Sequence, residues 1–253
     1  MTLKFKKALI IVWLTFLWFA LLGNVHAWDV PAYLRITSGA RLWFTLLDGD
    51  LIQEDKTKLG LVDNLGLKQD TLAYEYFSNF RLSNMHVLRL RFEPTTQYGQ
   101  SLSGSYQKIF DFRFGYDLDF YMTPQILFGA NIDMDVVKLE TLVNGVRVAG
   151  STFTYREEQT SAIPSFGLHG TFYPIVHGMA LRPHVSTRAN WWNFGDRATW
   201  EWDVTAGADV PVTHLWTWTV SGGYRVWNVR MDRTRDTADI TRTGFFLESS
   251  ILF

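Results

Sequence analysis

Apolar and polar residues alternate with a period of two along most of the chain. The clearest run is 109–122, where the even positions from Phe110 to Phe120 are apolar or aromatic and the odd positions from Asp111 to Asp119 are charged or glycine. Successive side chains of a β-strand point to opposite faces, so this period predicts strands with one apolar and one polar face. The same pattern predicts ten strands in all, at 33–46, 72–82, 86–93, 109–122, 126–135, 162–173, 179–191, 200–210, 216–229 and 240–253.

The connections between these strands alternate in length. Long ones at 47–69, 97–107 and 138–161 are separated by short turns such as 83–84 and 123–124. Within 138–161, Asn144-Gly145 is a hairpin dipeptide. If the hairpin were centred on this dipeptide, part of the next strand would have no partner. We therefore expect the hairpin to be centred nearer Ala149-Gly150, or to contain a β-bulge.

Residues 1–27 have the three parts of a secretory signal peptide. Three lysines precede an apolar run at 8–22, and Val25-His26-Ala27 forms a small-residue cleavage site. The apolar run is short for a spanning helix, which makes an uncleaved membrane anchor the less favoured alternative. We therefore expect a signal peptide at 1–27 and a single barrel at 28–253.

Composition narrows the class of protein. The absence of cysteine excludes disulfides, thiolate metal sites and a lipid anchor on cysteine. The chain has 24 lysines and arginines against 25 acidic residues, and loss of the three signal-peptide lysines leaves 21 against 25, a net charge of −4. A chain with this net negative charge lacks the excess of basic residues that is typical of nucleic-acid-binding proteins. No apolar run after residue 27 is long enough for a membrane helix, so a membrane location requires a closed sheet.

The end of the chain carries a more specific signal. Alternate positions counted back from Phe253 are Ile251, Ser249, Leu247 and Phe245, which are apolar except for the serine. This end resembles the C-terminal assembly signal of bacterial outer-membrane β-barrels. The resemblance implies an all-β fold, a transmembrane antiparallel up-and-down barrel, and recognition of the last strand by the barrel assembly machinery. Such barrels have an even number of strands, so eight is the alternative to ten.

Other features fit the same class. The leucine–glycine stretch 59–67 is similar to one in the first outer loop of many uncharacterised small outer-membrane barrels. Tryptophans near strand ends favour the headgroup level of a membrane, which predicts aromatic girdles from Trp191, Trp192, Trp200, Trp202, Trp216, Trp218 and Trp227. We expect a monomer in the bacterial outer membrane, exported through the periplasm and surrounded by lipid and lipopolysaccharide.

Alternation also assigns the side chains that face the interior of the barrel. The charged set that we expect to form a network is Arg35, Arg41, Arg91, Asp111, Arg113, Asp133, Asp135, Arg188, Glu201, Arg225 and Glu248. Hairpin register proposes these contacts: Arg91 with Asp111, Arg113 with Asp133, Arg188 with Glu201, Glu201 with Arg225, Arg225 with Glu248, and Glu248 with Arg35 or Arg41. Paired hydrogen bonds between arginine and carboxylate suit a crowded interior.

One possible catalytic motif is His184-Val185-Ser186, which resembles the His-x-Ser of lipid A deacylases. The next residue is Thr187, where that family has asparagine. The parity of the strand also turns His184 and Ser186 inward, although a lipid substrate lies outside the barrel.

Omptin proteases are a second outer-membrane enzyme family with ten strands, and they use acidic residues with a histidine at the outer rim. The candidate pairs here are Asp117 with Asp119 and Asp133 with Asp135. The first pair falls at the periplasmic end of its strand. The second pair is expected to form ion pairs with arginines. The inward His169 is more typical of a histidine that is hydrogen-bonded inside the lumen than of a catalytic base.

We therefore expect a non-enzymatic barrel with a charged lumen largely filled by side chains, because eight to ten strands leave little interior space. Its role would be structural or surface interaction through the loops at 47–69, 97–107 and 138–161. The alternative is a narrow pore for small polar solutes or ions, lined by the same charges. An outer-membrane hydrolase is a third possibility. No cofactor, metal or nucleic acid is expected.

Overall fold

The structure, a computed structural model, describes residues 34–52, 58–63, 67, 69–82, 85–99, 105–148, 151–174, 181–213, 216–232 and 237–253. The chain divides into two compact units, Met1–Leu34 and Arg35–Phe253. The signal peptide expected at 1–27 lies outside the described residues. Among those described, no helix is long and apolar enough to cross a membrane.

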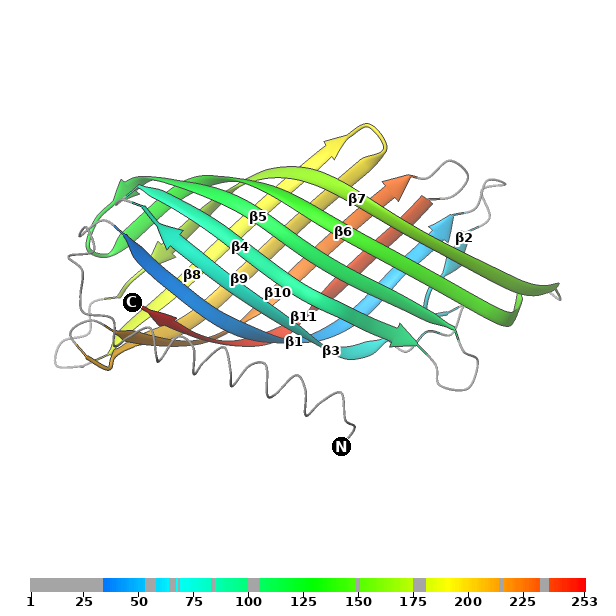
Figure 1. Cartoon of the computed structure of the whole chain (residues 1–253), viewed down its shortest axis with the longest axis horizontal. Helices are drawn as coiled ribbons and strands as arrows, with labels where there is room; N and C mark the ends of the chain where they lie inside the picture. Colours follow the sequence, from blue (N-terminus) through cyan, green and yellow to red (C-terminus); the bar gives the residue numbers. More distant parts are fainter. Residues whose placement is uncertain are drawn as a thin grey trace. The chain divides into compact units, whose positions relative to one another are not determined.

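The second unit is a closed antiparallel barrel (Figure 1). Its strands are β1 (Arg35–Ile52), β2 (Lys58–Gly60), β3 (Asp70–Arg81), β4 (His86–Gly99), β5 (Tyr106–Met122), β6 (Ile126–Val148), β7 (Ser151–Phe172), β8 (Arg182–Phe194), β9 (Arg197–Pro211), β10 (Thr217–Asp232) and β11 (Thr237–Leu252). Apart from the short β2, which pairs with β1, each strand pairs with its neighbours in chain order. The ten expected strands correspond to β1 and β3–β11, which confirms ten rather than eight.

The first and last strands close the barrel. Their register runs from Thr37 opposite Leu252 to Ile52 opposite Thr237. Ile36 and Phe253 extend it by exchanging two backbone hydrogen bonds of 2.9 Å. The terminal residue is therefore part of the seam, and no backbone edge is left open there.

The two ends of the barrel differ. Turns such as the one closed by Thr123 N and Ile126 O at 2.7 Å define one end, which we call the inner end. The C-terminus lies at this end, and the β6–β7 hairpin projects from the opposite one, which we call the outer end (Figure 1). Short turns on one side and longer excursions on the other are typical of outer-membrane barrels.

The strands extend further toward the outer end than the sequence pattern indicated. The expected loop 138–161 is mostly the β6–β7 hairpin, in which Val148 pairs with Ser151 and the register shifts between Val143 and Val146. The centre is therefore nearer 149–150 than 144–145, as expected, and a bulge is present as well. The expected loop 47–69 is also partly strand, because β1 continues to Ile52 and β2 folds back against it.

An inversion of polarity explains why the strands were predicted too short. Toward the inner end, outward residues such as Phe114 and Ile132 are apolar and exposed, and inward residues are charged. Beyond about Phe110 on β5 and Val136 on β6, outward residues such as Lys108 are charged and inward residues such as Ile109 and Leu139 are mostly apolar. We call the first zone the membrane-level half and the second the outer half. A change of surroundings from lipid to water requires this switch, because the outward face must match its solvent.

Candidate functional site

Arg225 lies at the centre of a charge network in the membrane-level half of the lumen. Its Nη1 donates to Glu75 Oε2 at 2.6 Å, and its Nη2 lies 3.0 Å from Glu201 Oε1. Glu201 also contacts Arg113 and lies 3.0 Å from Arg91. All but Arg91 are almost completely buried. The Glu201 carboxylate thus contacts three guanidinium groups, which share further carboxylates such as Glu75, so these residues stabilise one another as a unit.

The network crosses the seam between β1 and β11. Arg41 lies directly opposite Glu248 in the register, and its Nε and Nη2 donate to Glu248 Oε2 at 3.0 and 2.8 Å. Arg41 Nη1 also lies 3.5 Å from Glu75 and 3.4 Å from Asp203. Strands β1, β3, β9 and β11 are therefore joined by one arginine inside the barrel.

A second group of charges lies against β5 and β6. Arg188 donates from both Nη atoms to Asp117, at 3.1 and 2.8 Å. Arg89 contacts the same carboxylate at 2.8 Å and Asp133 at 2.5 Å. Asn190 donates to Asp133 at 2.6 Å. The carboxylates again bridge between strands that are far apart in the sequence.

Arg242 marks the outer limit of the network. Its two Nη atoms donate to Glu93 at 3.0 and 2.6 Å, and its Nε donates to the Tyr98 hydroxyl at 2.9 Å. The guanidinium also lies 4.3 Å from the ring centre of Trp43, within reach of a cation–π interaction. This arginine therefore joins the charged layer to the apolar layer above it.

The apolar layer fills the lumen of the outer half, and we call it the outer cluster. Its members are Trp43, Leu47, Leu51, Leu59, Leu61, Leu67, Ala73, Tyr98, Ile109, Val137, Leu139, Val143, Ile163, Trp227, Val229, Met231, Ala238, Ile240 and Phe246. Three of them come from the connection between β1 and β3, which folds into the barrel. Leu61 N donates to Gly49 O at 2.9 Å, and Leu67 N donates to Leu61 O at 3.0 Å. The connection expected to be a surface loop thus supplies leucines to the interior.

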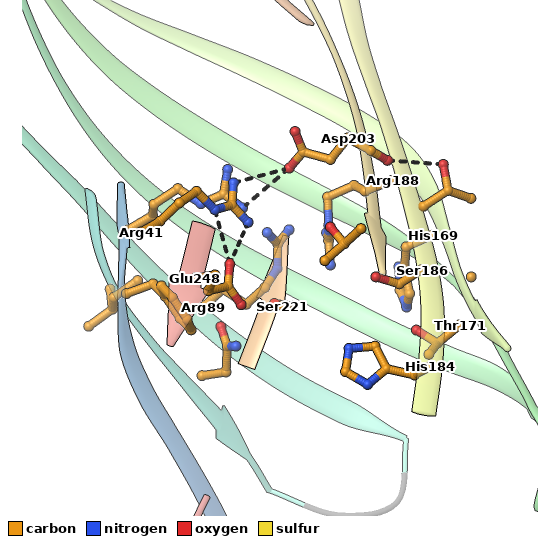
Figure 2. Close-up of a pocket in the computed structure, with 17 residues that line it drawn as sticks. Arg41, Arg89, His169, Thr171, His184, Ser186, Arg188, Asp203, Ser221 and Glu248 are labelled. Carbon is orange, nitrogen blue, oxygen red and sulfur yellow. Dashed lines mark hydrogen bonds and ion pairs between the residues drawn. The ribbon is translucent and has the colours of Figure 1, made fainter. Parts of the chain in front are cut away.

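A polar cavity of about 210 Å³ lies on the other side of the network, toward the inner end; we call it the inner cavity. Figure 2 shows His169, His184, Ser186 and Ser221 on its walls, with Arg41 and Arg188 nearby. Asp119 Oδ1 lies 2.7 Å from His169 Nε2 and is buried, so it orients the ring. Gly129 makes room for that ring, because a Cβ there would lie 2.6 Å from His169 Cε1 and Nε2.

The structure brings some of the predicted pairs together and separates others. The contacts Arg41 with Glu248 and Arg225 with Glu201 are present. The partners predicted for Arg91 and Arg113 are wrong by two residues. Arg91 lies opposite Arg113 rather than Asp111, and Arg113 lies opposite and contacts Asp135 rather than Asp133.

The expected contacts of Arg188 with Glu201 and of Arg225 with Glu248 are also wrong. Arg188 lies opposite Asp203 and binds Asp117 rather than Glu201. Arg225 contacts Glu75, Glu201 and Asp203, whereas Glu248 turns to Arg41. Arg35 is exposed at the inner end of β1, outside the network. A shift of two residues preserves which face each side chain points to, so alternation alone cannot detect it.

The tryptophans divide between the two sides of the wall. Trp191, Trp200, Trp202 and Trp218 are exposed on the outer surface. Trp227 is buried inside, so its assignment to a girdle was wrong, and Trp192 packs against the outer cluster. The shared parity of Trp227 and Arg225 was the signal that could have placed it in the lumen.

The residues of the expected assembly signal lie on the outer wall of β11. Phe245 and Leu247 are strongly exposed there, and Phe253 less so. Ile251 shares their parity and is partly buried. Ser249, the polar exception, accepts a hydrogen bond from Trp218 Nε1 at 2.9 Å, which satisfies its hydroxyl on a surface that is otherwise apolar.

Two histidines, His169 and His184, line the inner cavity. Among the described residues, no cluster of histidine and acidic side chains is suited to hold a metal ion. His184 and Ser186 both face the inner cavity, away from the outer surface of the barrel. His184 Nδ1 lies 3.6 Å from Asp209 Oδ1, beyond hydrogen-bond distance. This geometry provides no lipid-facing pair of the deacylase kind.

Comparison with known proteins supports the fold and does not specify a role. No protein family model matches the chain, and the curated proteins likewise include no match. Among solved structures, the outer membrane protease OmpT from Escherichia coli is similar with a TM-score of 0.50 and 11% identity, covering 88% of this chain and 97% of that chain.

Two other outer-membrane proteins align over similar lengths with lower scores. A Pseudomonas aeruginosa FadL homologue has a TM-score of 0.37 and 9% identity, covering 88% of this chain and 90% of that chain. Neisserial surface protein A has a TM-score of 0.34 and 8% identity, covering 87% of this chain and 96% of that chain. The closed barrel, its apolar band and the likeness to OmpT define the class: this chain has the fold of a small outer-membrane β-barrel protein.

Proposed function

We propose that the protein is a monomeric, non-enzymatic barrel of the bacterial outer membrane, with a sealed lumen and a structural or surface-interaction role through its outer half. The observation that carries this proposal is the double filling of the lumen. The charge network occupies the membrane-level half, and the outer cluster lies above it. A solute entering from outside would have to displace both layers.

The energetics of the two layers favour a closed barrel. Opening the outer cluster would expose Leu61, Val137 and Ile240, all of which are fully buried. Each such side chain contributes about 1.5–3 kcal/mol by burial. Opening the network would separate charges such as Arg225 and Glu201, and leaving a buried charge without its partner costs about 3–5 kcal/mol.

The outer half supports a role at the cell surface. Its outward face carries Lys108, Lys138 and Glu140, so it is suited to water rather than lipid. After residue 27, every lysine of the sequence falls at 56, 58, 68, 108 or 138, within the connection from β1 to β3 or on the outer parts of β5 and β6. Because the short turns of such barrels face the periplasm, we expect these lysines to lie outside the cell.

Planar-bilayer recording of the purified protein tests the sealed lumen. We expect no steady single-channel steps, with an established porin in the same bilayer as the positive control. Steady steps that disappear on substitution of Gly129 or Gly207 by tryptophan would overturn the sealed lumen and support a narrow pore, because these glycines lie against His169 and Ser221, which line the inner cavity.

Labelling of intact cells tests the orientation. A membrane-impermeant amine reagent is expected to modify Lys58, Lys108 and Lys138 before the cells are permeabilised. Modification only after permeabilisation would reverse the proposed orientation. A deletion of residues 140–160 then tests the surface role, since we expect it to reduce cell adhesion while the barrel still folds.

The non-enzymatic part of the proposal has its own test. We expect the purified barrel to turn over neither lipopolysaccharide nor a dibasic peptide. Turnover that is lost on Ser186→Ala or Asp133→Ala would overturn this part and establish an outer-membrane hydrolase.

A further inference from the structure

Within the described part of the chain, one edge of β7 has no partner strand in the outer half. β7 runs from Ser151 to Phe172 and pairs with β6 along almost all of that length. On its other side, it pairs with β8 only from Phe166 to Phe172. β8 ends at Phe194, whereas the β6–β7 hairpin continues further toward the outer end (Figure 1). We call the uncovered side of residues 154–162 the β7 edge.

The backbone groups that face the β7 edge belong to every second residue. In an antiparallel strand, one residue directs both its N–H and its C=O to the same neighbour, and the next residue directs them to the other neighbour. Ala162 O faces the β7 edge, because it accepts a hydrogen bond from Arg197 Nη1 of β9 at 2.9 Å. The backbone groups of Arg156, Glu158 and Thr160 therefore face the same way, and among the described residues no strand pairs with them on that side.

The part of the edge nearest to β8 is protected. Pro164 has the same parity as Ala162 and carries no N–H, so the β7–β8 ladder cannot continue through it. Beyond it, the side chains of Arg156, Glu158 and Thr160 are exposed on the outer surface. Charged residues protect an edge against unspecific pairing with apolar strands. They leave it available to a strand whose own charges complement them.

Arg156 provides the charge that is available to such a strand. Glu158 is already bound to Lys138 Nζ at 2.6 Å. The side chain of Arg156 is 74% exposed and approaches Glu140 only at 4.0 Å. Opposite charges on directly facing residues stabilise the pairing of two strands, and like charges destabilise it. The β7 edge therefore favours an added strand that has an acidic residue opposite Arg156.

An exposed aromatic ring lies where an added strand would meet the end of β8. Phe194 is the last residue of β8 and is 77% exposed. Its ring centre lies 6.1 Å from that of Trp192, which packs against the outer cluster. Phe194 thus continues the apolar surface of the outer cluster to the end of β8. An apolar side chain at one end of the added strand would cover this ring.

We propose that the β7 edge binds an extended segment of another protein, which adds to the sheet as an antiparallel strand. Backbone hydrogen bonds with Arg156, Glu158 and Thr160 supply affinity, as in other cases of strand addition. An acidic residue opposite Arg156 selects the register, and an apolar residue covers Phe194. This inference rests on the proposed surface role, for which it names the class of partner.

Titration of the full barrel in detergent with a labelled synthetic peptide tests the proposal. The peptide alternates valine and threonine, has leucine at its N-terminal end to contact Phe194, and carries one glutamate placed to lie opposite Arg156. We expect saturable binding by fluorescence anisotropy, and no binding of the same peptide with N-methylated amides. A peptide with lysine in place of the glutamate should bind about threefold to tenfold more weakly.

A charge reversal tests the register. Arg156→Glu should reverse the preference, so that the lysine peptide binds more tightly than the glutamate peptide. The matched variant Arg230→Glu alters an exposed arginine of β10 and should leave the preference unchanged. Absence of binding by both peptides, equal binding of the N-methylated peptide, or an unchanged preference in Arg156→Glu would each overturn the proposal.

A proline substitution tests the backbone contacts. Thr160→Pro removes an N–H that faces the β7 edge and leaves the β6–β7 hydrogen bonds in place. We expect unchanged urea unfolding and peptide binding that is weaker by about fivefold or more, whereas Thr160→Val, which keeps the N–H, should bind as the wild type does. Equal binding by Thr160→Pro would overturn the proposal. The surface role would still stand if the deletion of residues 140–160 reduced adhesion and the lysines were labelled on intact cells.

Discussion

The membrane-level half and the outer half of this barrel use the same ten strands with opposite polarity. In the first, the wall is apolar outside and charged inside, as Phe114 and Arg113 illustrate on β5. In the second, the wall is polar outside and apolar inside, as Lys138 and Leu139 illustrate on β6. The outer half therefore resembles a soluble β-barrel built on top of a membrane barrel.

The difference shows that the surroundings of the wall determine the chemistry of the lumen. Lipid outside requires apolar outward residues, so the inward positions of the membrane-level half are available for charges that pair across the barrel. Water outside allows polar outward residues, so the inward positions of the outer half can form a hydrophobic core. The lumen of the membrane-level half is therefore closed by ion pairs, and the lumen of the outer half is closed by hydrophobic packing.

The largest expected effect comes from breaking the charged half. Arg225→Met should destabilise the barrel by about 3–5 kcal/mol, because Glu75 and Glu201 remain buried with one cation fewer. Urea unfolding in detergent, followed by tryptophan fluorescence, measures the change. The matched variant Arg230→Met alters an exposed arginine of the same strand in the outer half and should stay within about 0.5 kcal/mol. Equal effects at both positions would contradict the network.

A lysine on the outer wall locates the boundary between the halves. Phe114→Lys places a charge in the apolar band and should cost about 2–4 kcal/mol. Thr95→Lys places the same charge on the outward face of β4 in the outer half, where the expected cost is about 0–1 kcal/mol. Folding into lipid vesicles under urea measures both. Similar costs would contradict the assignment of lipid and water to the two halves.

Removing one methylene group from an isoleucine can be compared between the packed outer cluster and the lipid-facing wall. Ile163→Val leaves a small void in the outer cluster, where Ile163 is 0% exposed, and should cost about 0.5–1.5 kcal/mol. Ile132 is 64% exposed on the apolar band. Ile132→Val should cost less than that range, because lipid chains can refill the space. Thermal unfolding of the two variants in the same lipid measures the difference, and an equal loss would contradict a packed outer cluster.

The smallest expected effect concerns Glu140 on the polar wall of the outer half. The hydrogen bond from the Tyr106 hydroxyl, at 2.7 Å, holds the pKa of Glu140 below its usual 4.5, helped by Lys108. The resulting stabilisation is present above pH 4.5 and is lost as pH falls through the lowered pKa. Tyr106→Phe should return the pKa toward 4.5 in a carbon NMR titration, whereas Tyr121→Phe at the inner end should leave it unchanged.

Most of the fold was predictable from the alternation of apolar and polar residues. The strand lengths that this alternation failed to predict have one physical cause. Ten strands, the closure of β11 on β1 and the inward parity of Arg225 and Glu248 follow from a period of two. The strands β6 and β7 were predicted too short because the apolar residues change from outward positions to inward positions at Val137 and Leu139. Such a change indicates the end of a strand if the outward face is assumed to contact lipid along its whole length. The reversed alternation of Val137, Leu139, Thr141 and Val143 was the available signal.

The sequence predicted which charged residues belong to the candidate site, and it did not predict which of them contact one another. Alternation assigned Arg91 and Arg113 to the lumen correctly, and it paired them with the wrong carboxylates. Any register shift of two residues leaves both strand faces unchanged, so turn positions that set the register to within two residues leave no trace in the period. The inner cavity depends on those same contacts, since it exists where the network ends.

The sequence by itself determined which side chains face inward, because parity along a strand is a local property. Only the tertiary structure decided which inward groups meet, because Arg225 and Glu75, or Arg242 and Glu93, lie across the lumen on strands far apart in the chain. It also decided that Leu59, Leu61 and Leu67 fold inside rather than out. That placement depends on an apolar space that exists only once ten strands have closed.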